Sequence, residues 1–265
     1  MLFNIVPGLV LFMLGSVVGS FMNVIVGRLP RGQSPWRGRS HCPKCRHVLS
    51  VADLVPLLSY VFLHGRCRYC KAPISTGYFW GEVFMGLAWL ITGLGVAIAG
   101  YDSALAMISL LIVSLLVLLF LYDFKTQLLP DIFVGPLVIL SIIWALIWPG
   151  VYSNSFALPL TFFTLDSNLI SGLAAALAAA GFLGLLWLVT RGRGMGLGDV
   201  KLALALGFLS GWPMIVDTLL GAFISGAIVG IILLSRGTKT LKSRLAFGPF
   251  LIGAQLIIWW WQLYN

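Results

Sequence analysis

Long apolar stretches follow one another along this 265-residue chain, and they constrain its fold more than any other feature of the sequence. Hydrophobic residues make up 60% of the chain and charged residues only 9%. A soluble domain carries roughly 25% charged residues, so this chain has too little polar surface to cover a globule in water. About 20 apolar residues are what an α-helix needs to cross a bilayer. The sequence therefore predicts an all-α polytopic membrane protein surrounded by the lipid bilayer.

Eight apolar stretches are candidates for transmembrane helices. No Lys or Arg precedes Arg28, so we interpret the first stretch as a retained span rather than a cleaved signal peptide. The sixth stretch is short, and we expect it to be tilted or joined to the Gly-rich turn before it. The eight candidates are residues 5–26, 78–99, 104–122, 132–149, 168–190, 200–212, 214–235 and 246–263.

Basic residues fall on one side of the membrane in this arrangement. The loops after the first, third, fifth and seventh stretches, together with Lys201 at the adjoining start of the sixth stretch, contain all 17 Lys and Arg residues, whereas the opposite loops near 100–103 and 150–167 contain none. Because basic loops face the cytosol, we expect these loops inside the cell and both termini outside. A net charge of +9 can indicate nucleic-acid binding in a soluble protein. Here the basic loops account for the charge, and we expect no nucleic-acid partner.

All four cysteines lie in one polar, basic segment after the first stretch, residues 27–77. They form two Cys-x2-Cys pairs, Cys42 with Cys45 and Cys67 with Cys70, separated by 21 residues. Two such pairs can place four thiolates tetrahedrally around Zn²⁺ and leave no open position for catalysis. Disulfides are not expected on a reducing, cytosolic side. The pattern predicts a structural zinc site; the alternative is a group of unligated thiols.

Two of the eight acidic residues fall at the expected cytosolic edge of the membrane. Asp123 ends the third stretch and Asp199 opens the sixth. Two carboxylates near a low-dielectric boundary can share one proton, so that one activates water while the other assists a carbonyl oxygen. Peptide hydrolysis without a nucleophilic side chain requires this arrangement. If the third and sixth stretches pack together, the two carboxylates can meet.

A simpler interpretation stays open for each aspartate. Asp199 can act only as a helix cap, and Asp123 can form an ion pair with Lys125. The Gly-x-Gly-x-Gly stretch before Asp199 could also suggest a phosphate-binding loop, but it lacks the Walker spacing and a preceding strand.

Other residues near the same edge are candidates for supporting roles. Gly196 and Gly198 would let a substrate backbone approach closely, and Lys201 follows them. Asp131 opens the fourth stretch, where a carboxylate favours a helix N-terminus. Glu82 lies one turn into the second stretch, where a packing role is about as well founded as a functional one.

Several short motifs together point to a known family, and they run from Gly19 to about Gly253. With them the sequence resembles the bacterial prepilin peptidases, the type IV prepilin leader peptidase and N-methyltransferase family. The motifs are Gly19-Ser20-Phe21-Met22-Asn23-Val24-Ile25, Arg28-Leu29-Pro30, the two cysteine pairs with Pro56-Leu57-Leu58-Ser59-Tyr60 between them, Pro73-Ile74-Ser75, Glu82, Asp123 with Leu129-Pro130-Asp131, Gly196-x-Gly198-Asp199-x-Lys201, and Phe247-Gly248-Pro249-Phe250.

The resemblance implies a bifunctional enzyme of the bacterial inner membrane. It would be an aspartic endopeptidase that cuts the basic leader from type IV prepilins and pseudopilins after a Gly, at the cytosolic face. It would also be a methyltransferase that uses S-adenosylmethionine to methylate the new N-terminal residue. The family's catalytic aspartates match Asp123 and Asp199. The sequence assigns no residues to S-adenosylmethionine, because it shows no Rossmann-like glycine motif.

The motifs divide the chain into three parts. We expect a first transmembrane helix over residues 1–26, a zinc-binding segment with four cysteine ligands over 27–77 and a transmembrane peptidase core over 78–265. Two other functions stay open. An ion-coupled transporter would carry its carboxylates near the middle of the bilayer. A non-catalytic assembly factor organised by the cysteine segment would tolerate loss of both aspartates.

Overall fold

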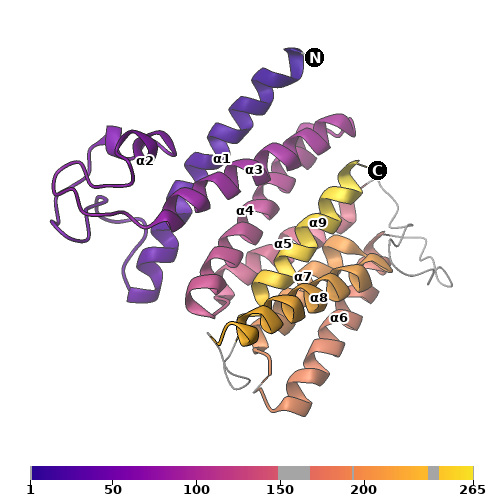
Figure 1. Ribbon diagram of the computed structural model, residues 1–265. Helices are drawn as coiled ribbons and strands as arrows, with labels where there is room; N and C mark the ends of the chain where they lie inside the picture. The colour runs from indigo at the N-terminus through magenta and orange to yellow at the C-terminus, as the bar shows by residue number, and fades with distance from the viewer. Residues whose placement is uncertain (1, 149–167, 193, 238–244, 265) are drawn as a thin grey trace. The chain divides into compact units, whose positions relative to one another are not determined.

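The computed structural model describes residues 2–148, 168–192, 194–237 and 245–264, and its regular structure is helical. Each of the eight apolar stretches forms a helix (Figure 1). Two short 3-10 helices, η1 (Leu29–Arg31) and η2 (Val51–Asp53), and the short helix α2 (Leu58–Phe62) lie in the segment that follows the first helix. The long helices are α1 (Leu2–Arg28), α3 (Thr76–Ile98), α4 (Ser103–Thr126), α5 (Asp131–Ile147), α6 (Asn168–Thr190), α7 (Leu197–Ser210), α8 (Met214–Ser235) and α9 (Gly248–Tyr264).

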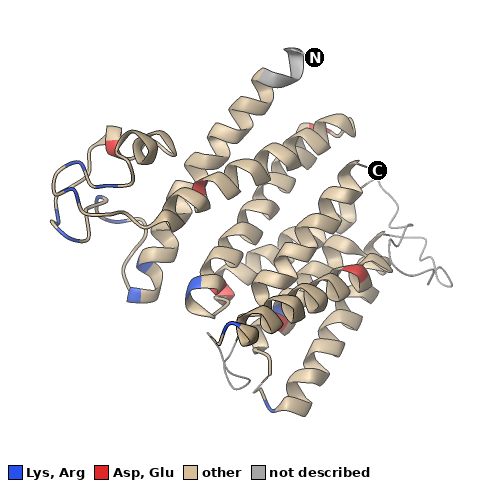
Figure 2. Cartoon of the chain, in the orientation of Figure 1, with Lys and Arg blue, Asp and Glu red and all other residues tan. Residues whose placement is uncertain are grey.

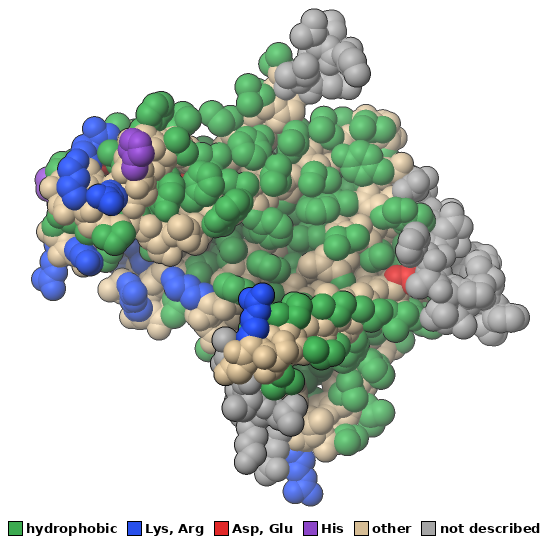
Figure 3. Space-filling view, in the orientation of Figure 1, with side chains coloured by type: hydrophobic (Ala, Val, Ile, Leu, Met, Phe, Trp, Pro, Cys, Tyr) green, Lys and Arg blue, Asp and Glu red, His purple; other side chains and the backbone are tan. Residues whose placement is uncertain are grey.

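The helix surfaces are those of a membrane protein. On α8, Ile224, Ile228 and Ile231 form an outward stripe at helical spacing and are 58%, 53% and 65% exposed. Figure 3 shows hydrophobic side chains spread over the visible helix faces. Figure 2 shows the charged residues mainly near helix ends and in the cysteine segment. Water would disfavour such apolar faces, whereas lipid tails solvate them. An all-α polytopic membrane protein is thus confirmed.

The expected number of eight spans is not confirmed. Among the described residues, five helices are long and apolar enough to cross a membrane: α3, α4, α6, α8 and the stretch Val6–Arg31. Helices α5 and α9 have 17 residues each. Helix α7 has 14 residues, about 21 Å of rise, against roughly 30 Å of bilayer core. The expected outer loop 150–167 lies outside the described residues.

The chain divides into two compact units, residues 1–94 and 95–265. In the first unit, glycines let α1 and α3 approach each other closely. A Cβ on Gly15 would lie 2.7 Å from the Cβ of Trp89, and one on Gly19 would lie 2.9 Å from the Cβ of Met85. Gly15 and Gly19 are four residues apart, the spacing at which small residues line up along a membrane-helix interface. The cysteine segment connects these two helices. The three-part division expected from the sequence stays a prediction.

The second unit packs α4 to α9 around buried aromatic side chains. Trp144 of α5 and Trp259 of α9 are fully buried, and their ring centroids are 5.3 Å apart. Helices α6 and α7 cross closely, because Gly207 has no side chain and the backbone of Ala176 occupies the position that a Cβ would take. Helices α5 and α9 each pack against both α4 and α7. This arrangement brings the ends of α4 and α7, which carry the two aspartates, into one neighbourhood.

Candidate active site and metal centre

Asp123 lies in the last turn of α4 and is 4% exposed. Its carboxylate faces the start of α9, where the backbone N–H of Gly248 is directed toward it. A Cβ on Gly248 would lie only 2.5 Å from Asp123 Oδ2, so this position requires glycine. Within the described residues, Oδ2 has no hydrogen-bond partner of good geometry. A buried carboxylate oxygen without a partner is costly in a folded protein and suggests a functional group.

Asp199 lies in the first turn of α7 and is 7% exposed. Its Oδ2 accepts a hydrogen bond of 3.2 Å from the backbone N–H of Gly196. The helix-cap interpretation of Asp199 is therefore correct as far as it goes. The absence of a side chain on Gly198 lets Leu129 pack against it, because a Cβ on Gly198 would lie only 2.9 Å from the Leu129 Cβ. Leu129 Cδ1 would also lie 3.5 Å from a Cβ on Gly248. Leu129 thus lies against both the glycine that precedes Asp199 and the glycine that faces Asp123.

The two carboxylates belong to one site. Asp123 interacts electrostatically with Asp199, although the residues are separated by 199 − 123 = 76 positions in the sequence. The ion pairs found in the described part of the chain join other residues, so Asp123 is not paired with Lys125. Two buried acids without a basic partner cannot both ionise cheaply, and sharing one proton resolves the repulsion. Such a pair can act as general acid and general base at once.

An ion pair joins the starts of α5 and α7 beside this site. Lys201 Nζ lies 2.8 Å and 2.9 Å from the two carboxylate oxygens of Asp131. Both side chains are exposed, 49% for Lys201 and 72% for Asp131. An exposed pair contributes about 0–1 kcal/mol to stability. Its main effect is therefore to hold the first turn of α7, which carries Asp199, against the first turn of α5, which Asp131 opens.

The four cysteine sulfurs form a compact cluster in the first unit. Their Sγ atoms all lie within 4.8 Å of one another, and no disulfide joins them. Cys42 and Cys70 Sγ are 3.8 Å apart. Zn–S bonds of about 2.3 Å in a tetrahedron require S···S separations of about 3.8 Å. Backbone N–H groups of Cys45 and Lys44 help to lower the pKa of the Cys42 thiol to about 6, which favours the thiolate form. The residues therefore fit a metal of the zinc type.

The two cysteine pairs share one backbone design. In the first, the Cys42 N–H donates to His47 O and the Arg46 N–H donates to Cys42 O. In the second, the Cys67 N–H donates to Ala72 O and the Lys71 N–H donates to Cys67 O. Arg46 and Lys71 both adopt the left-handed conformation, with φ of 58° and 57°. Two matching turns present each pair of sulfurs to the same point.

Asp53 fixes the segment between the cysteine pairs, a role the sequence did not reveal. Its carboxylate accepts hydrogen bonds from the Ser50 N–H at 3.0 Å and the Ser50 hydroxyl at 2.8 Å. It also accepts from Arg68 Nε at 2.6 Å and Tyr69 OH at 3.2 Å. Burial alone would raise the pKa of Asp53, but the hydrogen bonds from Ser50 and Arg68 hold it at about 2. Asp53 thus caps η2 and also connects it to the second cysteine pair.

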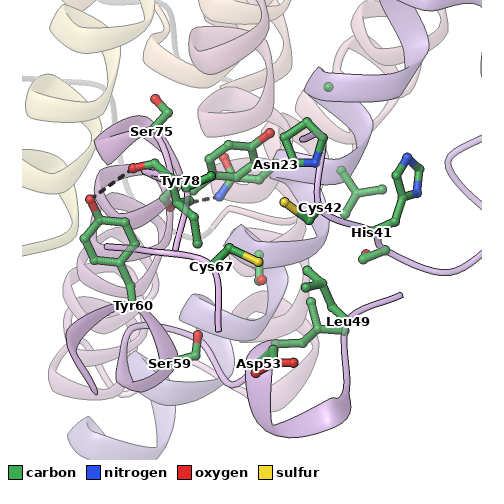
Figure 4. Close-up of a pocket in the computed structure, with 18 of the residues that line it drawn as sticks. Asn23, His41, Cys42, Leu49, Asp53, Ser59, Tyr60, Cys67, Ser75 and Tyr78 are labelled. Carbon is green, nitrogen blue, oxygen red and sulfur yellow. Dashed lines mark hydrogen bonds between the residues drawn. The ribbon is translucent and has the colours of Figure 1, made fainter. Parts of the chain in front are cut away.

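Glu82 borders a cavity of about 500 Å³ that lies wholly within the first unit (Figure 4). The walls come from the end of α1, from α2, from the cysteine turns and from the first turns of α3. Glu82 Oε2 accepts a 2.8 Å hydrogen bond from the Leu57 N–H. Asn23 Nδ2 donates to Tyr78 O at 2.9 Å across the helix pair. Neither the cavity nor the position of Asn23 could be anticipated from the sequence.

Comparison with known proteins agrees with this arrangement. A family model described as Bacterial Peptidase A24 N-terminal domain matches residues 13–96, and one described as the Type IV leader peptidase family matches residues 110–231. A relative from Burkholderia pseudomallei (strain K96243) is 33% identical over 90% of this chain and 80% of its own length. The chain belongs to the type IV leader peptidase family. The family resemblance seen in the motifs is thereby confirmed.

Other relatives of this family cover the chain to a similar extent. One from Pseudomonas aeruginosa is 32% identical over 94% of this chain and 88% of its own length. One from Legionella pneumophila is 32% identical over 96% of this chain and 91% of its own length. These two and the Burkholderia protein are named prepilin leader peptidase/N-methyltransferase. No solved structure matches the chain.

Proposed function

We propose that this chain is a membrane-embedded aspartic endopeptidase that removes the leader peptide of type IV prepilins and pseudopilins. It then methylates the new N-terminus with S-adenosylmethionine as methyl donor. The names of its relatives support both activities. The one-sided distribution of Lys and Arg supports a cleavage site at the cytosolic face of the bacterial inner membrane. A leader rich in basic residues would stay in the cytosol while the apolar part of the pilin lies in the bilayer.

The observation that carries the peptidase assignment is the pair of buried carboxylates, Asp123 and Asp199. Each comes from the end of a helix rather than from its middle, since α4 ends at Thr126 and α7 begins at Leu197. A transporter would be expected to hold its carboxylates near the bilayer midplane. Carboxylates at helix ends fit an enzyme that cuts at the membrane surface.

The pair supplies every proton transfer that peptide hydrolysis needs. The ionised carboxylate takes a proton from water as the water oxygen bonds to the scissile carbonyl carbon. The protonated carboxyl gives its proton to the carbonyl oxygen, which produces a gem-diol. When the C–N bond breaks, the first acid protonates the leaving nitrogen and a diol hydroxyl returns a proton to the second. One proton is again shared, so the site is ready for another cycle.

The cysteine cluster is proposed to hold a structural Zn²⁺ through Cys42, Cys45, Cys67 and Cys70. The sulfur spacing supports this choice of metal, and four thiolates leave no coordination position for water or substrate. The metal would therefore stabilise the fold of the segment between α1 and α3 and take no part in cleavage. Residues of the cluster and its surroundings also form part of the wall of the cavity that Glu82 borders.

Mass analysis of a prepilin incubated with the purified protein tests the proposal. With S-adenosylmethionine present, we expect the loss of the leader and the gain of one methyl group; without it, only the loss of the leader. An uncut prepilin in the presence of folded, zinc-containing protein would favour the non-catalytic assembly factor instead. Cleavage without any methyl transfer would retain the peptidase and reject the methyltransferase.

A further inference from the structure

The cavity of the first unit has the size and walls of a cofactor site. Its volume of about 500 Å³ lies within the 300–1,000 Å³ typical of pockets for molecules of this size. Apolar side chains such as Val24, Leu63 and Ile74 cover much of it, and a few polar groups point to a ligand that must be oriented. All residues that line this pocket precede residue 95, so none of them belongs to the unit that carries the aspartate pair.

A carboxylate without a basic partner borders this cavity. Among the described residues, no Lys, Arg or His forms an ion pair with Glu82. Two basic residues of the cavity are already engaged: Arg28 donates to Arg37 O at 2.9 Å, and Arg68 pairs with Asp53. Glu82 is only partly exposed, and one of its oxygens is bonded to the Leu57 N–H. A half-buried negative charge of this kind is best compensated by a cation.

Aromatic rings line the same cavity as this carboxylate. Tyr60 and Phe79 have ring centroids 5.2 Å apart and both line the cavity, as does Tyr78. In Figure 4 Tyr60 lies at the left of the view, and Asn23 and Cys67 lie to its right. Aromatic faces attract cations and also stack on flat heterocycles. A carboxylate combined with aromatic rings therefore selects a ligand that has a positive centre and a planar ring.

We propose that this cavity binds S-adenosylmethionine, with Glu82 facing the positively charged sulfonium and the aromatic wall receiving the adenine. Arg31 and Lys44, which also line the cavity, are placed to receive the ligand carboxylate. The inference rests on the proposed methylation and assigns that activity to the first unit, whereas cleavage depends on the second. No residues of the aspartate pair take part.

Binding of ligands that differ in charge tests the role of Glu82. Radiolabelled S-adenosylmethionine and sinefungin, which has an ammonium group in place of the sulfonium, should bind Glu82→Gln about tenfold or more weakly, because a charged contact is lost. S-adenosylhomocysteine, whose sulfur is neutral, should lose distinctly less affinity. Phe79→Leu should weaken S-adenosylmethionine binding about threefold through loss of ring contact. The matched carboxylate-to-amide control is Asp102→Asn at the α4 N-cap, which should bind all three ligands normally.

Photochemical cross-linking gives a second measurement that needs no variant. Ultraviolet irradiation of wild-type protein with radiolabelled S-adenosylmethionine should label peptides within residues 20–82. Label in peptides after residue 95, or equal binding by Glu82→Gln and the wild type, would overturn the site while leaving methylation intact. A wild-type protein that binds no S-adenosylmethionine would instead refute the proposed methylation itself. If Glu82→Gln raises only the KM for the pilin, the cavity receives the pilin amine and the cofactor assignment is wrong.

Discussion

Replacement of Gly248 by alanine should damage cleavage with little effect on the fold. The added Cβ would lie 2.5 Å from Asp123 Oδ2, whereas a relaxed carbon–oxygen contact needs about 3.5 Å. The close atom is the far end of a side chain, so the carboxylate moves by about 1 Å and the helices stay in place. A misplacement of about 1 Å in a reacting group costs about 100-fold in rate, so kcat/KM for prepilin cleavage should fall by about that factor.

The same helix provides a matched control for this change. Gly253 lies five residues further along α9, and a Cβ there would meet no atom within 4 Å. Gly253→Ala should therefore cleave prepilin like the wild type, and both variants should show similar thermal unfolding in detergent. Rates are measured by the mass of the cleaved product over time. Equal cleavage by Gly248→Ala and Gly253→Ala would refute the contact between Gly248 and Asp123 as a determinant of the site.

Substitutions at three further sites test other parts of the structure. Gly207→Ala should destabilise the α6–α7 crossing by about 1–3 kcal/mol, because its Cβ would meet the Ala176 backbone. Unfolding in denaturing detergent measures this loss of stability. The control Gly230→Ala, which has open space around it, should be neutral. Asp131→Asn and Lys201→Gln should each lower the free energy of unfolding by less than about 1 kcal/mol, yet each should slow prepilin cleavage severalfold. The double variant should cleave no more slowly than either single variant. Fully additive losses of rate would mean that the pair does not act as a unit. Cys67→Ser should lower the zinc content. It should reduce the affinity for S-adenosylmethionine by a larger factor than the rate of prepilin cleavage, because Cys67 lines the cavity. Retention of one zinc per chain would contradict the metal site.

The helices follow from the sequence because each apolar stretch is long enough to define one. Their ends are less accurate, and the differences matter for the site. The third stretch was expected to end at residue 122, but α4 continues to Thr126, whose hydroxyl donates to Tyr122 O. Asp123 therefore lies within the last helical turn. The sixth stretch was expected from residue 200, but α7 begins at Leu197, which places Asp199 in the first turn where it accepts from Gly196.

Contacts between distant segments are what the sequence could not provide. Gly248 meets Asp123 across 125 positions (248 − 123), and nothing local to either residue encodes that meeting. The link between Asp53 and Arg68 joins two turns of the cysteine segment in the same way. The sequence did identify the two aspartates and the four cysteines, since their residue types at those spacings already limit the chemistry. The cavity depends on the packing of α1 against α3, which only the fold determines.

The most direct test of the central claim compares Asp123→Asn, Asp199→Asn and the double variant. Each substitution keeps the size of the side chain and removes its ability to ionise. Because the two carboxylates act as one unit, each single variant should lose prepilin cleavage almost completely, and the double variant should be hardly worse. Zinc content and S-adenosylmethionine binding should remain at wild-type levels, which shows that the protein is folded. Substantial cleavage by a folded Asp199→Asn protein would contradict the mechanism.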